Sequence, residues 1–186
     1  MRTKVSRMFA IFVFTFFMGL ATQGKAGANV VSRSSDVAEL FGLPLNDLSV
    51  SLLEQHLNSK GLHSYPSYKD GVVSYSLGPE GILGVTNATI YSNGSGYVRR
   101  ALLSGVVESN EKRRALGELL VRKYGKPSEG LLNNGIGRPK WLFKDGTVIE
   151  LSNTTYDVSL MYVDENPKVV SRSGQIDVEA LSRKNQ

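Results

Sequence analysis

Two hairpin patterns constrain the fold of this chain more than any other feature. Residues 140–151, KWLFKDGTVIEL, place Asp-Gly between two β-rich runs, and this dipeptide supplies the positive φ angles of a tight turn. Residues 82–91 and 97–107 form a second β-rich pair around the loop SNGSG. Further strands are expected at 72–77 and 157–163. Together these runs predict an antiparallel sheet.

Two amphipathic helices are expected alongside the strands. The first covers residues 48–60 and ends at Gly61, where a left-handed C-cap is expected. The second has Ser109 or Asn110 as its N-cap and ends at Gly125, just before Lys-Pro. The apolar residues at helical spacing are Leu52, Leu53, His56 and Leu57 in the first helix, and Leu116, Leu119, Leu120 and Tyr124 in the second.

The order of these elements is a helix followed by three strands, twice. The glycines that end the two helices are 125 minus 61, or 64, residues apart. Few residues are identical between the halves, so the match is one of element order. The pattern predicts an α+β fold in which two amphipathic helices pack on an antiparallel sheet, with a tandem α-β-β-β repeat.

The N-terminus has the three parts of a secretory signal. An apolar run from Met8 to Ala21 contains 14 residues, too few for the roughly 20 that cross a bilayer. Three basic residues precede it, and Ala26-Gly27-Ala28 follows as a small-x-small cleavage site. Cleavage after Ala28 is predicted. Cleavage after Ala21 and an uncleaved membrane anchor are the alternatives.

The leader sets the expected domain organisation. We predict a signal peptide at 1–28, an N-terminal lead-in at 29–46, a single α+β domain at 47–163 and a polar, loose tail at 164–186. The remaining 186 minus 28, or 158, residues suffice for one hydrophobic core. Because the chain has no cysteine, it has no lipid-bearing Cys and no disulfide. We expect an unlipidated periplasmic protein.

Most of the positive charge belongs to the leader. The whole chain has a net charge of +5, but removal of Arg2, Lys4, Arg7 and Lys25 leaves 18 basic residues against 17 acidic ones. Residues 99–144 still carry 11 Lys or Arg against four Glu, a net charge of +7. Export and the lack of any nucleic-acid-binding motif argue against a nucleic-acid partner. An envelope protein, an anionic glycan or a membrane surface fits this charge better.

These cations define a candidate binding surface, the basic ridge. Those on the second helix fall mostly opposite its leucines and are expected to face solvent. The alternative is a solvated charged face without a ligand. The members of the basic ridge are Arg99, Arg100, Lys112, Arg113, Arg122, Lys123, Arg138 and Lys140.

Four aromatic residues form a second candidate surface: Tyr97, Trp141, Phe143 and Tyr156. Trp141 and Phe143 share one face of a strand because side chains alternate along it. On an exposed sheet face such rings would anchor a protein or a sugar. For Trp141 the favoured interpretation is instead burial under a helix.

Residues suited to catalysis are scarce. His56 and His63 are the only histidines and form no metal-ligand motif. No Gly-x-Ser-x-Gly motif occurs, and nothing in the spacing of Glu150 and Asp157 sets the separation that two glycosidase carboxylates need. We therefore expect no catalytic site, no metal site and no cofactor.

The element order carries a resemblance. FGLPL, a helix ending in glycine, strands, a second helix ending in KYGKP, and finally KWLFKDGTVIEL and VSLMYVDE cover residues 41–165. This order resembles small exported bacterial proteins of the β-lactamase-inhibitor-protein type, and is similar to small outer-membrane-assembly lipoproteins. It departs from the lipoproteins in lacking their cysteine. The resemblance implies partner binding in the cell envelope and transfers no site residue.

The leading hypothesis is an exported, soluble, non-enzymatic protein-binding module of the bacterial periplasm, of the inhibitor, immunity or scaffold type. A module for envelope glycan or anionic lipid is the first alternative, and a small hydrolase is the second.

Overall fold

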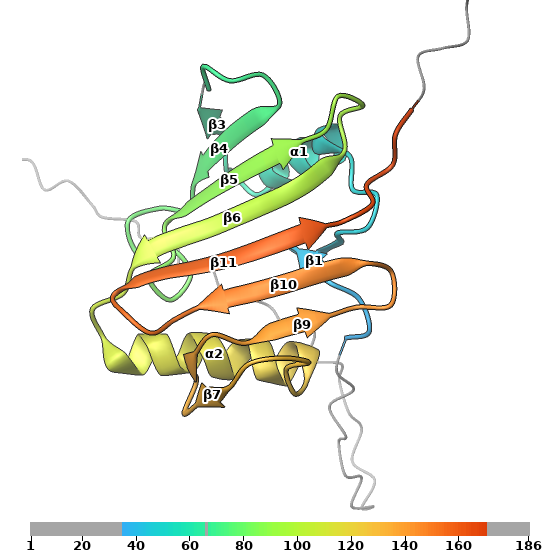
Figure 1. The fold of residues 1–186 in the computed structure, drawn as a ribbon. Helices are drawn as coiled ribbons and strands as arrows, with labels where there is room; N and C mark the ends of the chain where they lie inside the picture. Colours follow the sequence, from blue (N-terminus) through green and yellow to red (C-terminus); the bar gives the residue numbers. More distant parts are fainter. Residues whose placement is uncertain (1–34, 66, 171–186) are drawn as a thin grey trace, which may run out of the picture. The chain divides into compact units, whose positions relative to one another are not determined.

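The computed structural model describes residues 35–65 and 67–170 (Figure 1). These residues form two helices, α1 (Val50–Ser59) and α2 (Asn110–Tyr124). The strands are β1 (Glu39–Leu40), β2 (Leu43–Pro44), β3 (Ser64–Tyr65), β4 (Val72–Ser76), β5 (Asn87–Ser92), β6 (Val98–Val106), β7 (Leu132–Asn133), β8 (Ile136–Gly137), β9 (Lys140–Leu142), β10 (Thr147–Ser152) and β11 (Asp157–Asp164). The predicted leader, residues 1–28, and tail residues 171–186 lie outside the described residues.

Seven of the strands form one antiparallel sheet in the order β3-β4-β5-β6-β11-β10-β9. The two central strands, β6 and β11, pair from Val106 opposite Asp157 to Arg100 opposite Val163. The predicted α+β class, with two helices and an antiparallel sheet, is thus confirmed for the described part of the chain.

Both helices begin at a serine whose hydroxyl caps the first turn, and α2 ends at a glycine. The hydroxyl of Ser49 accepts a hydrogen bond from the backbone N–H of Leu52 at the start of α1, and Ser109 accepts one from Lys112 at the start of α2. Gly125 ends α2 with a φ of 78°, a conformation that favours glycine. The sequence analysis allowed either Ser109 or Asn110 as the N-cap of α2, and in the structure the N-cap is Ser109.

Two strand predictions need correction. The strand expected at 82–91 begins only at Asn87, because residues 82–85 make a tight turn closed by the Ile82 and Val85 backbones. The segment 128–139, expected to be a loop, contains the hairpin β7–β8. Asn134 and Gly135 at its turn both have positive φ, as a two-residue hairpin turn requires.

The β7–β8 hairpin lies tightly against α2. A Cβ atom built on Gly117 of α2 would come within 2.0 Å of the Gly135 carbonyl oxygen. The side chain of Asn153, just after β10, donates hydrogen bonds to the carbonyl oxygens of Arg113 (2.7 Å) and Gly135 (2.9 Å). Asn153 therefore joins α2, the hairpin and the end of β10.

The hydrophobic core includes more of the N-terminal segment than expected. Ala38, Leu40 and Leu45 are fully buried and belong to the core with side chains of both helices and the sheet. The backbone N–H of Ser35 donates to the carbonyl of Lys123 at 2.7 Å. The packed domain thus begins before residue 47, within the predicted lead-in.

The first part of the predicted loose tail is also held in place. Asp164 is fully buried, and its carboxylate accepts a hydrogen bond from the backbone N–H of Asp47 at 3.0 Å. The N–H of Lys168 donates to the Asp47 carboxylate at 2.6 Å, and that of Val170 donates to the Ser95 hydroxyl at 2.9 Å. The expectation of a loose tail is therefore wrong for residues 164–170.

Tyr75, on β4, is a buried residue with an unusual hydroxyl. The hydroxyl finds no hydrogen-bond partner among the described residues, and burial, with the charge of Glu54, raises the pKa of Tyr75 to about 12. Because an unpaired buried hydroxyl is unfavourable, we expect Tyr75→Phe to keep or raise the free energy of unfolding at neutral pH, by up to about 1 kcal/mol. Urea unfolding of both proteins measures the difference.

The difference in free energy of unfolding between Tyr75→Phe and the wild type should grow at alkaline pH. The unfolded phenol ionises near pH 10, whereas the folded one stays neutral to about pH 12, so the wild type loses stability across this interval. The variant has no such group at position 75, and its remaining tyrosines are shared with the wild type. A variant clearly less stable at neutral pH would show that the hydroxyl has a partner.

Candidate functional site

The candidate site is the open face of the seven-stranded sheet, meaning the side that faces away from the core. Alternation along each strand sends residues such as Ala88 and Ile90 of β5 into the core and their neighbours, such as Thr89, to the opposite side. Figure 1 shows the sheet with this open face toward the reader and α1 behind it.

Register places the side chains of the open face in three rows across the strands. The hydroxyl row consists of Ser76, Asn87, Ser104, Ser159 and Ser152. The middle row consists of Tyr65, Ser74, Thr89, Leu102, Met161, Glu150 and Lys140. The apolar row consists of Val72, Tyr91, Arg100, Val163, Val148 and Leu142. One side of the face is therefore polar but uncharged, and the other is largely apolar.

Exposed apolar side chains occur on this face. Tyr91 is 37% exposed and Leu142 is 48% exposed. Leu102, Met161 and Val163 are half-buried, near the middle of the face. Side chains that remain accessible on a rigid sheet can be covered by a partner without rearrangement of the backbone.

The two cations on the open face differ in their surroundings. The ammonium of Lys140 lies 2.7 Å from the carboxylate of Glu150, and this hydrogen bond and charge raise the pKa of Lys140. Arg100 stands between Tyr91 and Val163 in the apolar row. Of the three ion pairs in the described part of the chain, none includes Arg100 or Arg99.

A β-bulge brings these two arginines together. Tyr91 pairs with Arg100 and Ser92 pairs with Val98, so Arg99 is the extra residue of β6. Both arginines are exposed and line a hollow of about 300 Å³. Its other walls come from Tyr91 and Ser92 of β5, Val72 of β4 and the preceding turn at Asp70 and Gly71. Ser92 is fixed there by its N–H, which donates to the Gly71 carbonyl at 2.8 Å.

The basic ridge is not one continuous surface. Arg99, Arg100 and Lys140 belong to the sheet, while Arg122 of α2 and Arg138, before β9, are exposed elsewhere. On α2, Lys112 pairs with Glu80 at 3.4 Å, and Lys123 pairs with Glu39 at 2.8 Å.

Arg113 contradicts the expectation that the helix cations face solvent. Its side chain is only 8% exposed, donates to the side-chain oxygen of Asn110 and lies 5.3 Å from the centre of the Tyr156 ring. The reason is its spacing, since Arg113 precedes the buried Leu116 and Leu120 by three and seven residues and so shares their helix face.

The four candidate aromatic residues do not form one face either. Trp141 is buried, as the core interpretation predicted, and its indole N–H donates to the Gly125 carbonyl at 3.0 Å. Phe143 packs edge-on against Tyr124, with ring centres 5.5 Å apart. Tyr97 contacts the ammonium of Lys168, and Tyr156 lies under Arg113. The exposed aromatic rings of the open face are Tyr91 and Tyr65, and the sequence analysis selected neither.

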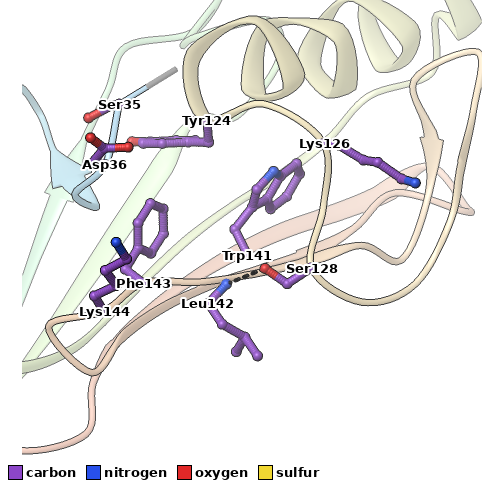
Figure 2. A pocket seen from close by; sticks show the side chains of 9 residues that line it. All are labelled: Ser35, Asp36, Tyr124, Lys126, Ser128, Trp141, Leu142, Phe143 and Lys144. Carbon is purple, nitrogen blue, oxygen red and sulfur yellow. Dashed lines mark hydrogen bonds between the residues drawn. The ribbon is translucent and has the colours of Figure 1, made fainter. Parts of the chain in front are cut away.

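A second hollow, of about 170 Å³, lies beside Trp141 (Figure 2). The rings of Tyr124, Trp141 and Phe143 line it, with the side chains of Lys126 and Lys144 at its margins. Trp141 and Tyr124 are core residues held by hydrogen bonds, to Gly125 and to Glu39 respectively. This hollow is therefore less suited to a protein partner than the broad open face.

Groups with catalytic or metal-binding potential are dispersed. Glu150 lies opposite Met161, four residues along β11 from Asp157, and is already paired with Lys140. A ring nitrogen of His56 hydrogen-bonds to the Phe41 carbonyl oxygen at 3.0 Å. Across residues 35–65 and 67–170, no three His, Asp or Glu side chains gather as a metal site would require.

Neither helix of the described segment combines the length and the apolar character needed to span a membrane. Comparison with known proteins finds no match: no protein-family model, no curated protein and no solved structure corresponds to this chain.

Proposed function

We propose that this protein is an exported, non-enzymatic binding module that engages another protein in the periplasm through the open face of its sheet. The observation that supports this most directly is the apolar row, in which Arg100 forms no ion pair and lies between the exposed Tyr91 and the half-buried Val163. Tyrosine and arginine surrounded by apolar side chains are the residues most often found at the energetic centre of protein interfaces.

Export is proposed from the leader pattern at residues 1–28, with its basic start, short apolar run and small-residue cleavage site. An inhibitor, an immunity protein or an assembly scaffold would act in this setting by covering a surface of its partner. A small hydrolase, the second alternative from the sequence, gains no support from the dispersed acids and histidines.

We also propose that the helices form a second layer on the sheet and that the two halves of the chain are a tandem repeat. The strand order supports a repeat, because β4-β5-β6 of the first half is followed in space by β11-β10-β9 of the second. The last strands of the two halves, β6 and β11, thus pair with each other at the centre of the sheet. The resemblance to proteins of the β-lactamase-inhibitor-protein type fits this arrangement.

The proposed function predicts that a charge at the middle of the open face weakens partner binding. Leu102→Glu places a charge at the middle of the open face, where Leu102 lies half-buried between Thr89 and Met161. We expect it to weaken partner binding at least about tenfold, since the partner would have to desolvate a charge in place of an apolar side chain. The measurement is capture of proteins from an envelope extract of the host by immobilised wild type and variant at moderate salt.

Arg122→Glu is the matched control, because it introduces the same side chain at an exposed position of α2. A protein captured stoichiometrically by wild type and by Arg122→Glu, but not by Leu102→Glu, would support the proposal. Equal capture by all three proteins would place the interface elsewhere.

The glycan alternative is favoured by one feature, the hydroxyl row, whose serine and asparagine side chains resemble those that bind sugar hydroxyl groups. Retention of peptidoglycan fragments, lost on Leu102→Glu and without any captured protein, would establish that alternative.

A further inference from the structure

One cation on the open face of the sheet, Arg100, forms no ion pair with a described carboxylate. Lys140, at the far end of the middle row, is neutralised by Glu150 on the adjacent strand. Arg100 has no such neighbour, since Tyr91 and Val163 flank it in register and no described carboxylate forms an ion pair with it. A partner that covered this row would desolvate Arg100, and desolvation without a counter-ion is unfavourable. The occupant must therefore supply negative charge at this position.

The bulge strengthens this requirement. Because Arg99 is the extra residue of β6, two arginines adjacent in sequence line the same hollow. Asp70 also lines the hollow but forms an ion pair with neither arginine, so the lining keeps a net charge of two minus one, or +1. Guanidinium groups match the planar geometry of a carboxylate, to which they donate paired hydrogen bonds.

The surroundings of the arginines define what must lie next to that carboxylate. Tyr91 and Val72 form an apolar wall of the hollow, and Val163 continues the apolar row on the other side of Arg100. A small free anion would leave this apolar surface uncovered. An acidic side chain within a peptide segment that also carries apolar side chains would satisfy both features.

We infer that Arg100, assisted by Arg99, binds an aspartate or glutamate side chain of the protein partner, one flanked by apolar residues that cover Tyr91 and Val163. This inference rests on the proposed function and names the chemistry of the partner. Arg100 is then the residue on this face that selects the partner, because a segment without the acid would leave the arginine buried and uncompensated.

The test uses a phage-displayed library of random linear peptides, selected on protein purified after expression of the full chain. Soluble Leu102→Glu protein is added as competitor, so that only peptides that need the intact open face are retained. We expect the retained peptides to carry Asp or Glu beside aromatic or aliphatic residues. Arg100→Gln should weaken their binding at least about tenfold, whereas Arg122→Gln, at an exposed position on α2, should change it less than about twofold.

A second arm separates charge pairing from shape. Replacement of the peptide's acid by its amide should weaken binding to the wild type by at least about the same factor, and should weaken binding to Arg100→Gln much less, because only Arg99 remains there. Because Arg100 is exposed, Arg100→Gln should melt at the same temperature as the wild type. This measurement is the control that the variant is folded. Peptides that require the open face but carry no acid, or that bind Arg100→Gln as tightly as the wild type, would overturn this inference and leave the proposed function standing. Absence of any peptide that requires the open face would overturn both.

Discussion

Asn153→Asp is expected to lower the free energy of unfolding by more than about 3 kcal/mol at neutral pH. Asn153 is fully buried, and its side-chain amide donates to the carbonyl oxygens of Arg113 and Gly135. The substitution replaces this donor with a carboxylate oxygen of almost the same size. Two hydrogen bonds are lost, and a buried negative charge then faces two carbonyl oxygens, which is among the most unfavourable changes a core can undergo.

The acid dependence of this variant provides a second test. A buried carboxylate without a partner holds its proton more tightly in the folded protein than in the unfolded chain. The variant should therefore recover part of its stability as the pH falls, because the protonated acid can donate to one of the two carbonyls. Urea unfolding at neutral and mildly acidic pH measures both effects. Asn133→Asp, at an exposed position of β7, is the control and should change stability by less than about 0.5 kcal/mol.

Trp141→Ala is the second large effect, with an expected loss of about 3–5 kcal/mol. The indole is 2% exposed, packs against Tyr124 with ring centres 6.4 Å apart, and donates to the carbonyl of Gly125 at the end of α2. Its removal leaves a cavity at the junction of α2 and β9 and an unpaired carbonyl. Unfolding followed by circular dichroism is the suitable measurement, because Trp141 is the only tryptophan.

Trp141→Phe and Leu142→Ala complete this test. The phenylalanine variant keeps an aromatic ring but loses the hydrogen bond, so a loss of about 1–3 kcal/mol is expected. Leu142 is half-exposed on the opposite side of the same strand, and its truncation should cost less than about 1 kcal/mol. Similar losses for Trp141→Ala and Leu142→Ala would contradict the assignment of Trp141 to the core.

Local signals explain why much of the fold was predictable. The N-cap serines and the glycines after each helix act through their immediate neighbours, and so does the Asp145-Gly146 turn between β9 and β10. The β7–β8 hairpin was missed although Asn134-Gly135 is a strong turn signal, because each of its strands has only two residues. Such short strands depend on the docking of Gly135 against Gly117, which no local pattern contains.

The candidate site was only partly predictable, for a physical reason. Arg99 and Arg100 were selected from the sequence as part of a charge excess, but their separation from the helix cations depends on β6 pairing with β11. That pairing brings together Arg100 and Val163, which are distant in the chain. The burial of Arg113, in contrast, follows from its spacing to Leu116 and could have been predicted.

The pairing of β6 with β11 at the centre of the sheet also limits the order in which the strands can assemble during folding. β6 has nine residues, and the strand that covers its second edge is β11, the last strand in the described chain. The N-terminal part of an exported chain emerges first, so β4, β5 and β6 can associate while the long edge of β6 still lacks a neighbour. The helix α2 and four further strands must emerge before β11 itself is available. Throughout that interval the chain exposes the unpaired backbone groups along the free edge of β6. The pairing of β6 with β11, at the middle of the finished sheet, is therefore the last to form.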